Sequence, residues 1–376
     1  MSDCYLPRLG GIERQVHELA IRQRDAGHDV VVVTSAPGDG SRAADGIQVV
    51  RPARGASPTR MRYEWSVVGC KAVLRGGFDV VHVHASSFSP LAFVTASRAS
   101  AARLPTVVTV HSLWAGATPL FQAADRLARW GEWRVAWSAV SSPAAEPLRR
   151  ILGGRTPVTI LPNGVDAAEW KVQDLPRSPD RVVVATVGRL AVRKRPGPLL
   201  RMLREARARL PADIRLEAIL VGDGPLRRPL ERYVETTGMA DWVSLRGPAT
   251  HTELRDMYAG VDFYIAPATL ESFGIAALEA RCAGLPVVAH RGSGVSEFIV
   301  DATDGLLSCG DAEMVDSIVR LAGSESLRGC MRTHARAVPP PVSWPGILDA
   351  TEALYDRARA VAGASEDPRR KLALIG

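Results

Sequence analysis

The hydrophobic pattern of the chain alternates between short β-branched runs and stretches with helical spacing. Residues 12–26 place Ile12, Val16 and Leu19 near helical spacing, and Gly27 is suited to ending that helix. The sequence DVVVVT at 29–34 follows at once and is typical of a buried strand. Because this order of helix and strand recurs, we expect parallel, doubly wound α/β sheets.

The alternation runs twice, with a break between the two series. In the first series we expect further strands at 47–51, 80–84, 107–111, 135–141 and 158–161. In the second series we expect strands at 182–187, 216–221, 243–246, 263–266 and 286–289. The expected helices of the second series are 199–210, 226–237, 253–259 and 274–283.

The breaks in the pattern predict the domain limits. Residues 171–180 contain two prolines and four charges and are typical of a linker, and the proline-rich segment 338–345 interrupts the chain again. We therefore expect two Rossmann-like domains, 1–170 and 181–345, facing a central cleft. Residues 346–376 then supply a last helix and a frayed tail. Only MSDCYL precedes Pro7, which predicts a short or truncated first strand and a start upstream of Met1.

Composition narrows the class of protein. The chain has 376 residues, of which 46% are hydrophobic and 23% charged, an ordinary balance for a globular protein of two domains. No run approaches the roughly 18 apolar residues of a membrane span, and the N-terminus does not resemble a signal peptide. The five cysteines form no CxxC pair, which favours free thiols in a reducing compartment. We expect a cytoplasmic protein.

The net charge of +7 is compatible with three classes of partner: nucleic acid, an anionic membrane and a polyanionic small molecule. Residues 51–75 hold six basic residues, one acid and two aromatic residues, Tyr63 and Trp65. Such a segment can rest on anionic lipid at the inner face of a membrane, or it can be a solvated basic surface. Because no recognisable reading module is present, we do not expect a nucleic-acid partner.

Two motifs of the second series carry candidate chemistry. Arg189 and Lys194 follow the strand at 182–187, where two cations suit a diphosphate; a basic surface loop is the alternative. Glu271 and Glu279 flank a turn that enters a helix, whose first N–H groups form an anion site. Glu279 can accept hydrogen bonds from the two ribose hydroxyls, and Glu271 from sugar hydroxyls. The alternative is that Glu271 caps the helix and Glu279 is solvated.

These segments resemble the family-4 retaining glycosyltransferases, which have the GT-B fold. The resemblance covers about residues 5–320 and includes the family's glutamate–seven–glutamate signature. It rests on LPRLGGIERQVHELA, DVVHVHASSFSPLA, VVTVHSLW, ILPNGVDAAEW, VGRLAVRKRPGPLL, LVGDGPLRRPL, VSLRGPATHTELRDMYAGVDFYIAP, ESFGIAALEARCAGLPVVAHRGSGVSEFI and DGLLSCGD. One departure is Arg195, where many relatives have glycine; it either adds a phosphate contact or reshapes the loop.

The resemblance implies a role for each matching residue. Arg189 and Lys194 bind the donor diphosphate, and Glu279 holds the ribose. Glu271, with the amides of Phe273, Gly274 and Ile275, holds the transferred sugar and phosphate. Ser272 belongs to the same donor-binding turn. The backbone of Arg246, Gly247 and Pro248 meets the nucleobase.

The resemblance implies that the first domain forms the acceptor side of the site. Gly10 and Gly11 let amides approach the donor phosphate and the acceptor, although a plain tight turn is the alternative. His111 ends a strand and matches a family histidine near the reacting sugar, whereas we expect a structural role for His84. The resemblance also implies that the last helix crosses back to the first domain.

The expected activity is retaining transfer of a hexose (mannose, glucose or N-acetylglucosamine) from a nucleotide-diphosphate sugar. The acceptor is a lipid, a glycan or a small molecule. No cofactor is expected, since the nucleotide-sugar is a substrate. The chain also lacks the Asp-x-Asp pair of metal-dependent GT-A enzymes, so we expect no metal. Three alternatives stay open: a nucleotide-sugar epimerase, a sugar phosphorylase and a non-catalytic nucleotide-sugar-binding protein.

Overall fold

The computed structural model describes residues 1–7, 10–36, 38, 45–51, 68–173, 175, 178, 180–363 and 371–373. The chain divides into two compact units, Met1–Gly164 with Trp344–Gly376, and Val165–Ser343. The first limit therefore lies before the expected linker at 171–180. Residues 165–170 join the second unit because the Val165 amide donates to the Val342 carbonyl (3.1 Å) and the Trp170 ring lies against His251.

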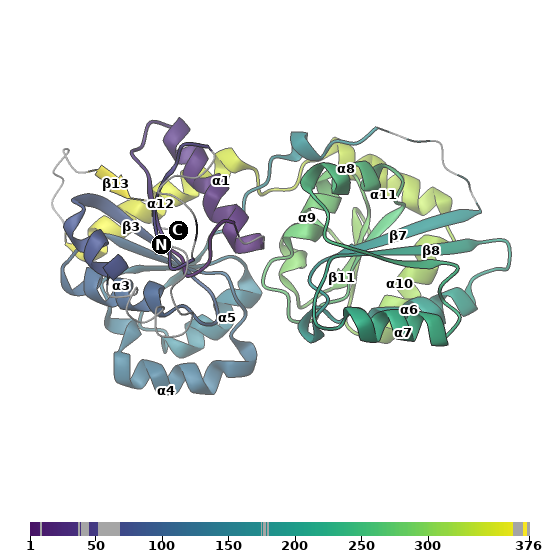
Figure 1. Ribbon diagram of the computed structural model, residues 1–376, viewed down its shortest axis with the longest axis horizontal. Coiled ribbons are helices and arrows are strands. Elements are labelled where there is room, and N and C mark those ends of the chain that lie inside the picture. Colours follow the sequence, from purple (N-terminus) through teal and green to yellow (C-terminus); the bar gives the residue numbers. More distant parts are fainter. Residues whose placement is uncertain are drawn as a thin grey trace. The chain divides into compact units, whose positions relative to one another are not determined.

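The first unit is built on a parallel sheet (Figure 1). Its strands β3 to β6 lie in chain order, with β13 on the other edge of β3. A separate parallel pair, β1 and β2, is linked to this sheet through Ser2, which bridges both Thr34 and His84. The expected first strand is thus short, reduced to this bridge. The bounds are β1 (Val31–Val33), β2 (Gln48–Val50), β3 (Phe78–Ala85), β4 (Thr106–Val110), β5 (Ala136–Ala139), β6 (Val158–Ile160) and β13 (Lys371–Ala373).

The helices of the first unit cover a sheet whose central strands are buried on both faces, as parallel sheets require. The last helix, α12, packs against β3, β4, β5 and α1. The prediction of a frayed tail was wrong at 371–373, because these residues pair with β3 at Phe78 and Val81. The remaining tail residues lie outside the described residues. The helices are α1 (Gly11–Asp25), α3 (Pro90–Ala101), α4 (Thr118–Ala128), α5 (Ser142–Ile151) and α12 (Trp344–Ala362).

The second unit has a six-stranded parallel sheet in the order β12-β11-β10-β7-β8-β9. Its first strand, β7, lies in the middle, so the strand order reverses between β7 and β10. The bounds are β7 (Arg181–Val187), β8 (Arg215–Val221), β9 (Val243–Arg246), β10 (Phe263–Ala266), β11 (Val287–His290) and β12 (Gly305–Ser308).

Six helices cover the two faces of this second sheet. Figure 1 shows α6, α7 and α10 on one side of the sheet and α8, α9 and α11 on the other. Apolar side chains of α6 and α10 meet those of β7, β8 and β11 in one core cluster. The helices are α6 (Pro196–Arg209), α7 (Arg227–Thr236), α8 (His251–Ala259), α9 (Ile275–Cys282), α10 (Asp311–Ala322) and α11 (Glu325–Ala337).

Three observations bear on other sequence predictions. The five cysteines are free thiols. Over the described ranges, no helix is long and apolar enough to span a bilayer. Most of the basic segment 51–75, including Arg54, Arg60, Arg62, Tyr63 and Trp65, lies outside the described residues, so its membrane role stays a prediction.

Candidate functional site

The reversal of strand order in the second unit defines the candidate site. The strands β7 and β10 are parallel neighbours, with Phe263 opposite Val184 and Tyr264 opposite Ala185. Their carboxyl ends therefore lie side by side, and the loops that follow them diverge to opposite faces of the sheet. In open α/β sheets a ligand binds in the crevice that this divergence creates. The predicted cations follow β7, and the predicted glutamates follow β10.

The loop after β7 packs backbone to backbone on the loop after β8. The Gly188 amide donates to the Val221 carbonyl (3.0 Å), and the Leu190 amide donates to the Asp223 carbonyl (2.8 Å). Gly222 has a φ of +132°, and a Cβ there would lie 2.0 Å from the Gly188 oxygen. The glycine is therefore required by its conformation and by the close approach. The segment Gly222-Asp223-Gly224-Pro225 therefore shapes the neighbouring loop.

The loops after β7 and β10 are joined by an ion pair between Lys194 Nζ and Glu271 Oε2. The Glu271 side chain is 14% exposed and the Lys194 side chain 42%. Arg189 precedes this pair in the first loop, where its side chain is exposed and, within the described part of the chain, makes no ion pair. Glu271 therefore uses its carboxylate on Lys194, whereas Arg189, as far as the described residues show, remains open to a ligand.

The start of α9 is fixed by glycines on two segments. Gly274 precedes the helix with a φ of +92°, and a Cβ there would lie 2.6 Å from Val295 Cγ2. Gly294 donates its amide to the Glu271 carbonyl (2.8 Å), and a Cβ on Gly294 would lie 2.2 Å from the Ser272 oxygen. The turn at 271–274 is thus held against the loop after β11.

Phe273 holds this turn in place through its buried side chain. Its ring is buried (2% exposed) and lies 5.4 Å from the Phe298 ring. The side chain is unavailable to a ligand, whereas Ser272, Gly274 and Ile275 are partly exposed. Because the first N–H groups of a helix have no partner inside it and lie at the positive end of the dipole, they can bind an anion.

Glu279 lies one turn inside α9 and is buried, with 7% of its surface exposed. This burial contradicts the alternative of a merely solvated glutamate. Burial, the neighbouring Tyr264 and the charge of Glu279 together raise the pKa of Tyr258. The hydroxyl of Tyr264 donates to the Val187 carbonyl at the end of β7 and accepts from its amide (both 3.1 Å). Glu279 therefore lies in a packed, rigid part of the carboxyl edge.

The predicted base-contacting residues follow β9. Arg246, Gly247 and Pro248 are all exposed. The carbonyls of Arg246 and Gly247 accept from the Gly222 amide at 3.2 and 3.1 Å. Three consecutive loops, after β7, β8 and β9, are therefore connected through their backbones along the carboxyl edge of the second sheet.

In the first unit, Gly10 and Gly11 lie at the start of α1. Gly10 has an extended φ of −173°, so its conformation does not require glycine. The space around it is limited by Glu13, whose carboxylate oxygen would lie 2.3 Å from an added Cβ. The Gly10 carbonyl accepts from the Arg14 amide (3.2 Å) as a normal helix start. A role for these amides in donor binding stays a prediction.

His111 follows β4 and is nearly buried (7% exposed). Its Nε2 lies 2.9 Å from Nδ1 of His84, which is also buried. Burial lowers the pKa of His111 to about 4 and lowers the pKa of His84 well below its usual value, so both rings are neutral at pH 7. The pairing of His84 with His111 was not expected from the sequence.

A buried polar network surrounds the two histidines. His82 stacks on His84 with centroids 4.1 Å apart, because residues i and i+2 of β3 face the same side. The sequence Val81-His82-Val83-His84 contains the signal for this stacking, because alternate residues of a strand lie on the same face. His82 also contacts the Tyr355 hydroxyl of α12 (3.1 Å) and the Thr109 hydroxyl (2.7 Å). His84, His111, Thr109 and Asn163 line a small cavity of about 20 Å³.

Among the described residues, no group of three or more histidine, cysteine, aspartate or glutamate side chains could hold a metal ion. Among the described residues of the loop after β7, the cations are Arg189, Arg193, Lys194 and Arg195. Arg193 Nε donates to the Leu270 carbonyl (3.3 Å).

Comparisons with known proteins extend these observations. Residues 9–169 match the model of Glycosyltransferase Family 4, and residues 181–324 match that of Glycosyl transferases group 1. A phosphatidylinositol N-acetylglucosaminyltransferase subunit of Arabidopsis thaliana is 27% identical over 95% of this chain and 81% of its own length. D-inositol 3-phosphate glycosyltransferase of Nocardia farcinica is 29% identical over 77% and 70%.

Solved structures show the same fold. Anabaena HepE, determined with UDP and glucose, superposes with a TM-score of 0.72 at 18% identity, covering 94% of this chain and 99% of that one. Sucrose-phosphate synthase from Thermosynechococcus elongatus gives a TM-score of 0.72 at 22% identity, covering 96% of each chain. The predicted architecture of two parallel-sheet α/β domains, the GT-B fold, is therefore confirmed.

Proposed function

The chain belongs to the family-4 glycosyltransferases of GT-B fold, and from this premise we propose that it transfers a hexose from a nucleotide-diphosphate sugar by a retaining, metal-independent reaction. One observation carries the proposal: Arg189, the Lys194–Glu271 pair and the start of α9 meet where the strand order reverses. This arrangement offers two cations and a helix dipole to a diphosphate, and carboxylates to the sugar hydroxyls.

The proposed chemistry combines these charges with the course of reaction that the family resemblance implies. The bond between the anomeric carbon and the diphosphate breaks, and the negative charge on the leaving oxygen is stabilised by Arg189, Lys194 and the first amides of α9. The acceptor hydroxyl adds to the same face of the sugar, so the anomeric configuration is retained. Its proton passes to the leaving phosphate, and no separate general base is required. His111 and the Gly10–Gly11 amides contribute on the acceptor side.

The relatives suggest which acceptors to test. Two groups of relatives are named for phosphatidylinositol and for inositol 3-phosphate as acceptors. We propose an acceptor from the wider class of lipids, glycans and small molecules, with D-inositol 3-phosphate and phosphatidylinositol as first candidates. We place the reaction in the cytoplasm, at the inner face of the membrane if residues 51–75 contact anionic lipid.

The test begins with donor binding. The chain is unfolded thermally with UDP-, GDP- and ADP-sugars, each with and without EDTA. A donor at about one hundred times its dissociation constant stabilises a protein by roughly 2.7 kcal/mol. We expect one nucleobase to give this shift in EDTA, and Arg189→Ala and Glu279→Ala to remove it. A shift that requires added metal contradicts metal independence.

The reaction type is tested with the donor so identified. NMR of the product formed on each candidate acceptor should show the donor's anomeric configuration, and inversion would contradict the retaining mechanism. Turnover of donor alone would indicate an epimerase, and dependence on inorganic phosphate a phosphorylase. Binding without turnover on any acceptor, unchanged by Glu271→Ala, would indicate a binding protein.

A further inference from the structure

Arg195 occupies an unusual position in the second unit. It follows Lys194 directly and precedes α6, with a φ of 55°, in the left-handed region that favours glycine. A residue with a side chain persists in this conformation when its surroundings hold it there. The contacts of the guanidinium show what holds it.

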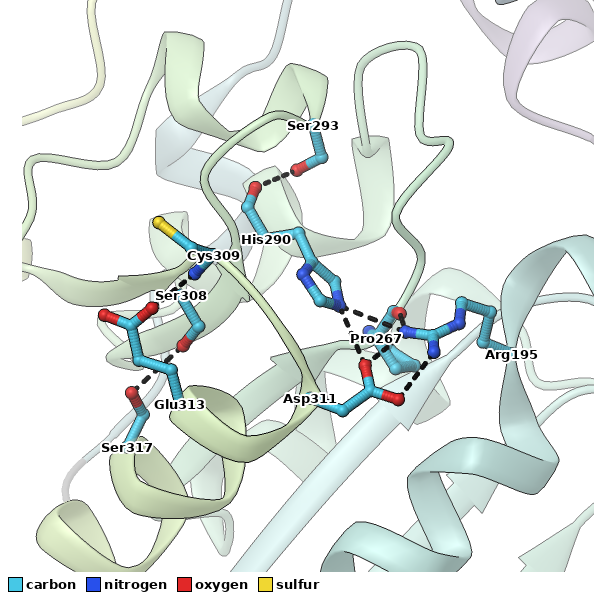
Figure 2. Close-up of polar contacts among 9 residues, drawn as sticks. All are labelled: Arg195, Pro267, His290, Ser293, Ser308, Cys309, Asp311, Glu313 and Ser317. Carbon is cyan, nitrogen blue, oxygen red and sulfur yellow. Dashed lines mark hydrogen bonds and ion pairs between the residues drawn. The ribbon is translucent and has the colours of Figure 1, made fainter. Parts of the chain in front are cut away.

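The Arg195 guanidinium binds Asp311 at the start of α10 through two parallel hydrogen bonds (Figure 2). Nη1 lies 2.8 Å from Oδ1 and Nη2 lies 2.7 Å from Oδ2. This fork geometry is specific to arginine, because a lysine ammonium cannot reproduce it. The bonds from Arg195 lower the pKa of Asp311 and keep that carboxyl ionised.

The same guanidinium contacts two further strand ends. Nη1 donates to the Pro267 carbonyl, directly after β10, at 3.1 Å. It also lies 3.1 Å from Nε2 of His290, the last residue of β11. A guanidinium can only donate, so His290 accepts through Nε2 and carries its proton on Nδ1. Burial and the charge of Arg195 lower the pKa of His290, which favours this neutral form.

The Arg195–Pro267 bond and the Lys194–Glu271 pair both join the loop after β7 to the loop after β10. Arg193 Nε adds a longer bond between these loops, to the Leu270 carbonyl (3.3 Å). Lys194 and Arg195 are adjacent in the chain. In the loop after β10 the partners are Glu271 and the Pro267 carbonyl, four positions apart. The Lys194–Glu271 pair must open when a diphosphate binds the Lys194 ammonium. The Arg195 bonds use groups that need not change partner.

We propose that Arg195 is a positioning residue for donor binding: its bonds to Pro267, His290 and Asp311 hold the two loops in place while Lys194 exchanges Glu271 for the donor diphosphate. This inference rests on the proposed function. Arg195 does not itself bind phosphate, because its guanidinium is already engaged on three partners and its side chain is only 21% exposed. The exposed Arg189 serves as the phosphate ligand.

The experiment compares Arg195→Ala with Arg181→Ala. Arg181 forms the same kind of fork with Glu217 (both bonds 2.7 Å), but at the amino end of β7, away from the site. Calorimetric titration measures binding of UDP, GDP and ADP, and of uridine, guanosine and adenosine, to each folded variant. For the nucleoside diphosphate that the wild type binds, we expect Arg195→Ala to weaken binding about tenfold. The affinity for the corresponding nucleoside should stay unchanged. Arg181→Ala should change neither.

Arg195→Gly provides the second variant, because glycine adopts a φ of 55° without strain and the fold is then retained. It should lose diphosphate affinity as Arg195→Ala does. Wild-type affinity in Arg195→Gly, or equal weakening of diphosphate and nucleoside, overturns the positioning role while leaving the proposed function standing. A wild-type chain that binds none of the three diphosphates overturns both.

Discussion

Nδ1 of His84 and Nε2 of His111 lie 2.9 Å apart, and the two rings form a buried pair at the carboxyl ends of β3 and β4. Since neither ring is charged at neutral pH, one nitrogen donates and the other accepts. The bond fixes the orientation of His111, which the family resemblance places near the reacting sugar. It also makes the stability of the first unit depend on pH.

We expect the free energy of unfolding to fall as pH decreases from about 6.5 to about 4. The folded pKa of His111 is about 4, below the unfolded value near 6.5, so in this window the unfolded chain binds a proton that the folded chain does not. The loss is about 1.4 kcal/mol per pH unit for one such group. Urea unfolding at pH 7.5, 6 and 5 measures it.

His111→Asn is the matched variant for that measurement, because asparagine forms hydrogen bonds without titrating. Carboxylates also contribute at the acid end of the range, and they do so equally in both proteins. The wild type should therefore lose stability more steeply than His111→Asn between pH 6.5 and 5. Parallel pH profiles for the two proteins would show that His111 is not held neutral in the folded chain.

Lys194→Ala should strongly impair transfer without unfolding the protein. The Lys194–Glu271 pair is partly exposed, and such pairs contribute only about 0 to 1 kcal/mol to stability. A cation that meets charge developing in the transition state contributes more, so we expect transfer to fall by about 10² to 10³. Arg215→Ala, which removes an exposed pair with Asp180 at the other end of the sheet, should leave transfer unchanged. Equal activity in Lys194→Ala and wild type would reject Lys194 as a donor ligand.

Gly222→Ala should destabilise the second unit and weaken donor binding together. The added Cβ would lie 2.0 Å from the Gly188 oxygen, at a φ of +132° that alanine rarely adopts. Overpacking of this kind costs about 1 to 3 kcal/mol, and relief of the clash displaces the loop that carries Arg189. Gly329→Ala, in α11, is the control, because no atom lies within 4 Å of its added Cβ. Thermal unfolding with and without donor separates the two effects. If Gly222→Ala has the thermal stability and donor binding of the wild type, these loops are not in close contact.

The sequence predicted features that depend on local spacing. The expected helix at 274–283 is observed as Ile275–Cys282, and the expected strand at 216–221 is observed as Arg215–Val221. Spacing also predicted that Glu271 and Glu279 flank the start of this helix, because their positions relative to one turn and one helix are encoded in nine residues; their roles stay predictions. The resemblance then supplied roles that spacing alone leaves open.

Features that depend on strand order could not be predicted. Arg195 and Asp311 are 116 positions apart, and they meet because they lie at the starts of α6 and α10, which pack against each other on one face of the sheet. No periodicity encodes that packing. The domain limit between Gly164 and Val165 was not predicted, for a similar reason. The proline-rich composition of 171–180 marks a linker, whereas the assignment of the preceding residues depends on Trp170 packing against His251.

Removal of the buried Asp304 carboxylate should destabilise the second unit severely. Asp304 Oδ2 accepts from Arg281 Nη2 at 2.8 Å, and the two side chains are only 2% and 1% exposed. Arg281 also donates to the Ala335 and Val338 carbonyls at the end of α11 (2.5 and 3.0 Å). Asp304→Ala leaves a guanidinium buried without its counter-charge, which costs about 3 to 5 kcal/mol.

The control for this prediction is Glu217→Ala, which removes the carboxylate of an exposed pair with Arg181 and should cost no more than about 1 kcal/mol. Urea unfolding of both variants gives the comparison. Asp304→Ala combined with Arg281→Met should recover part of the loss, because the buried charge is then removed as well. If the double variant is no more stable than Asp304→Ala, the cost comes from the lost Asp304 contacts, such as its bond from the Val300 amide (2.8 Å), and not from an unpaired charge.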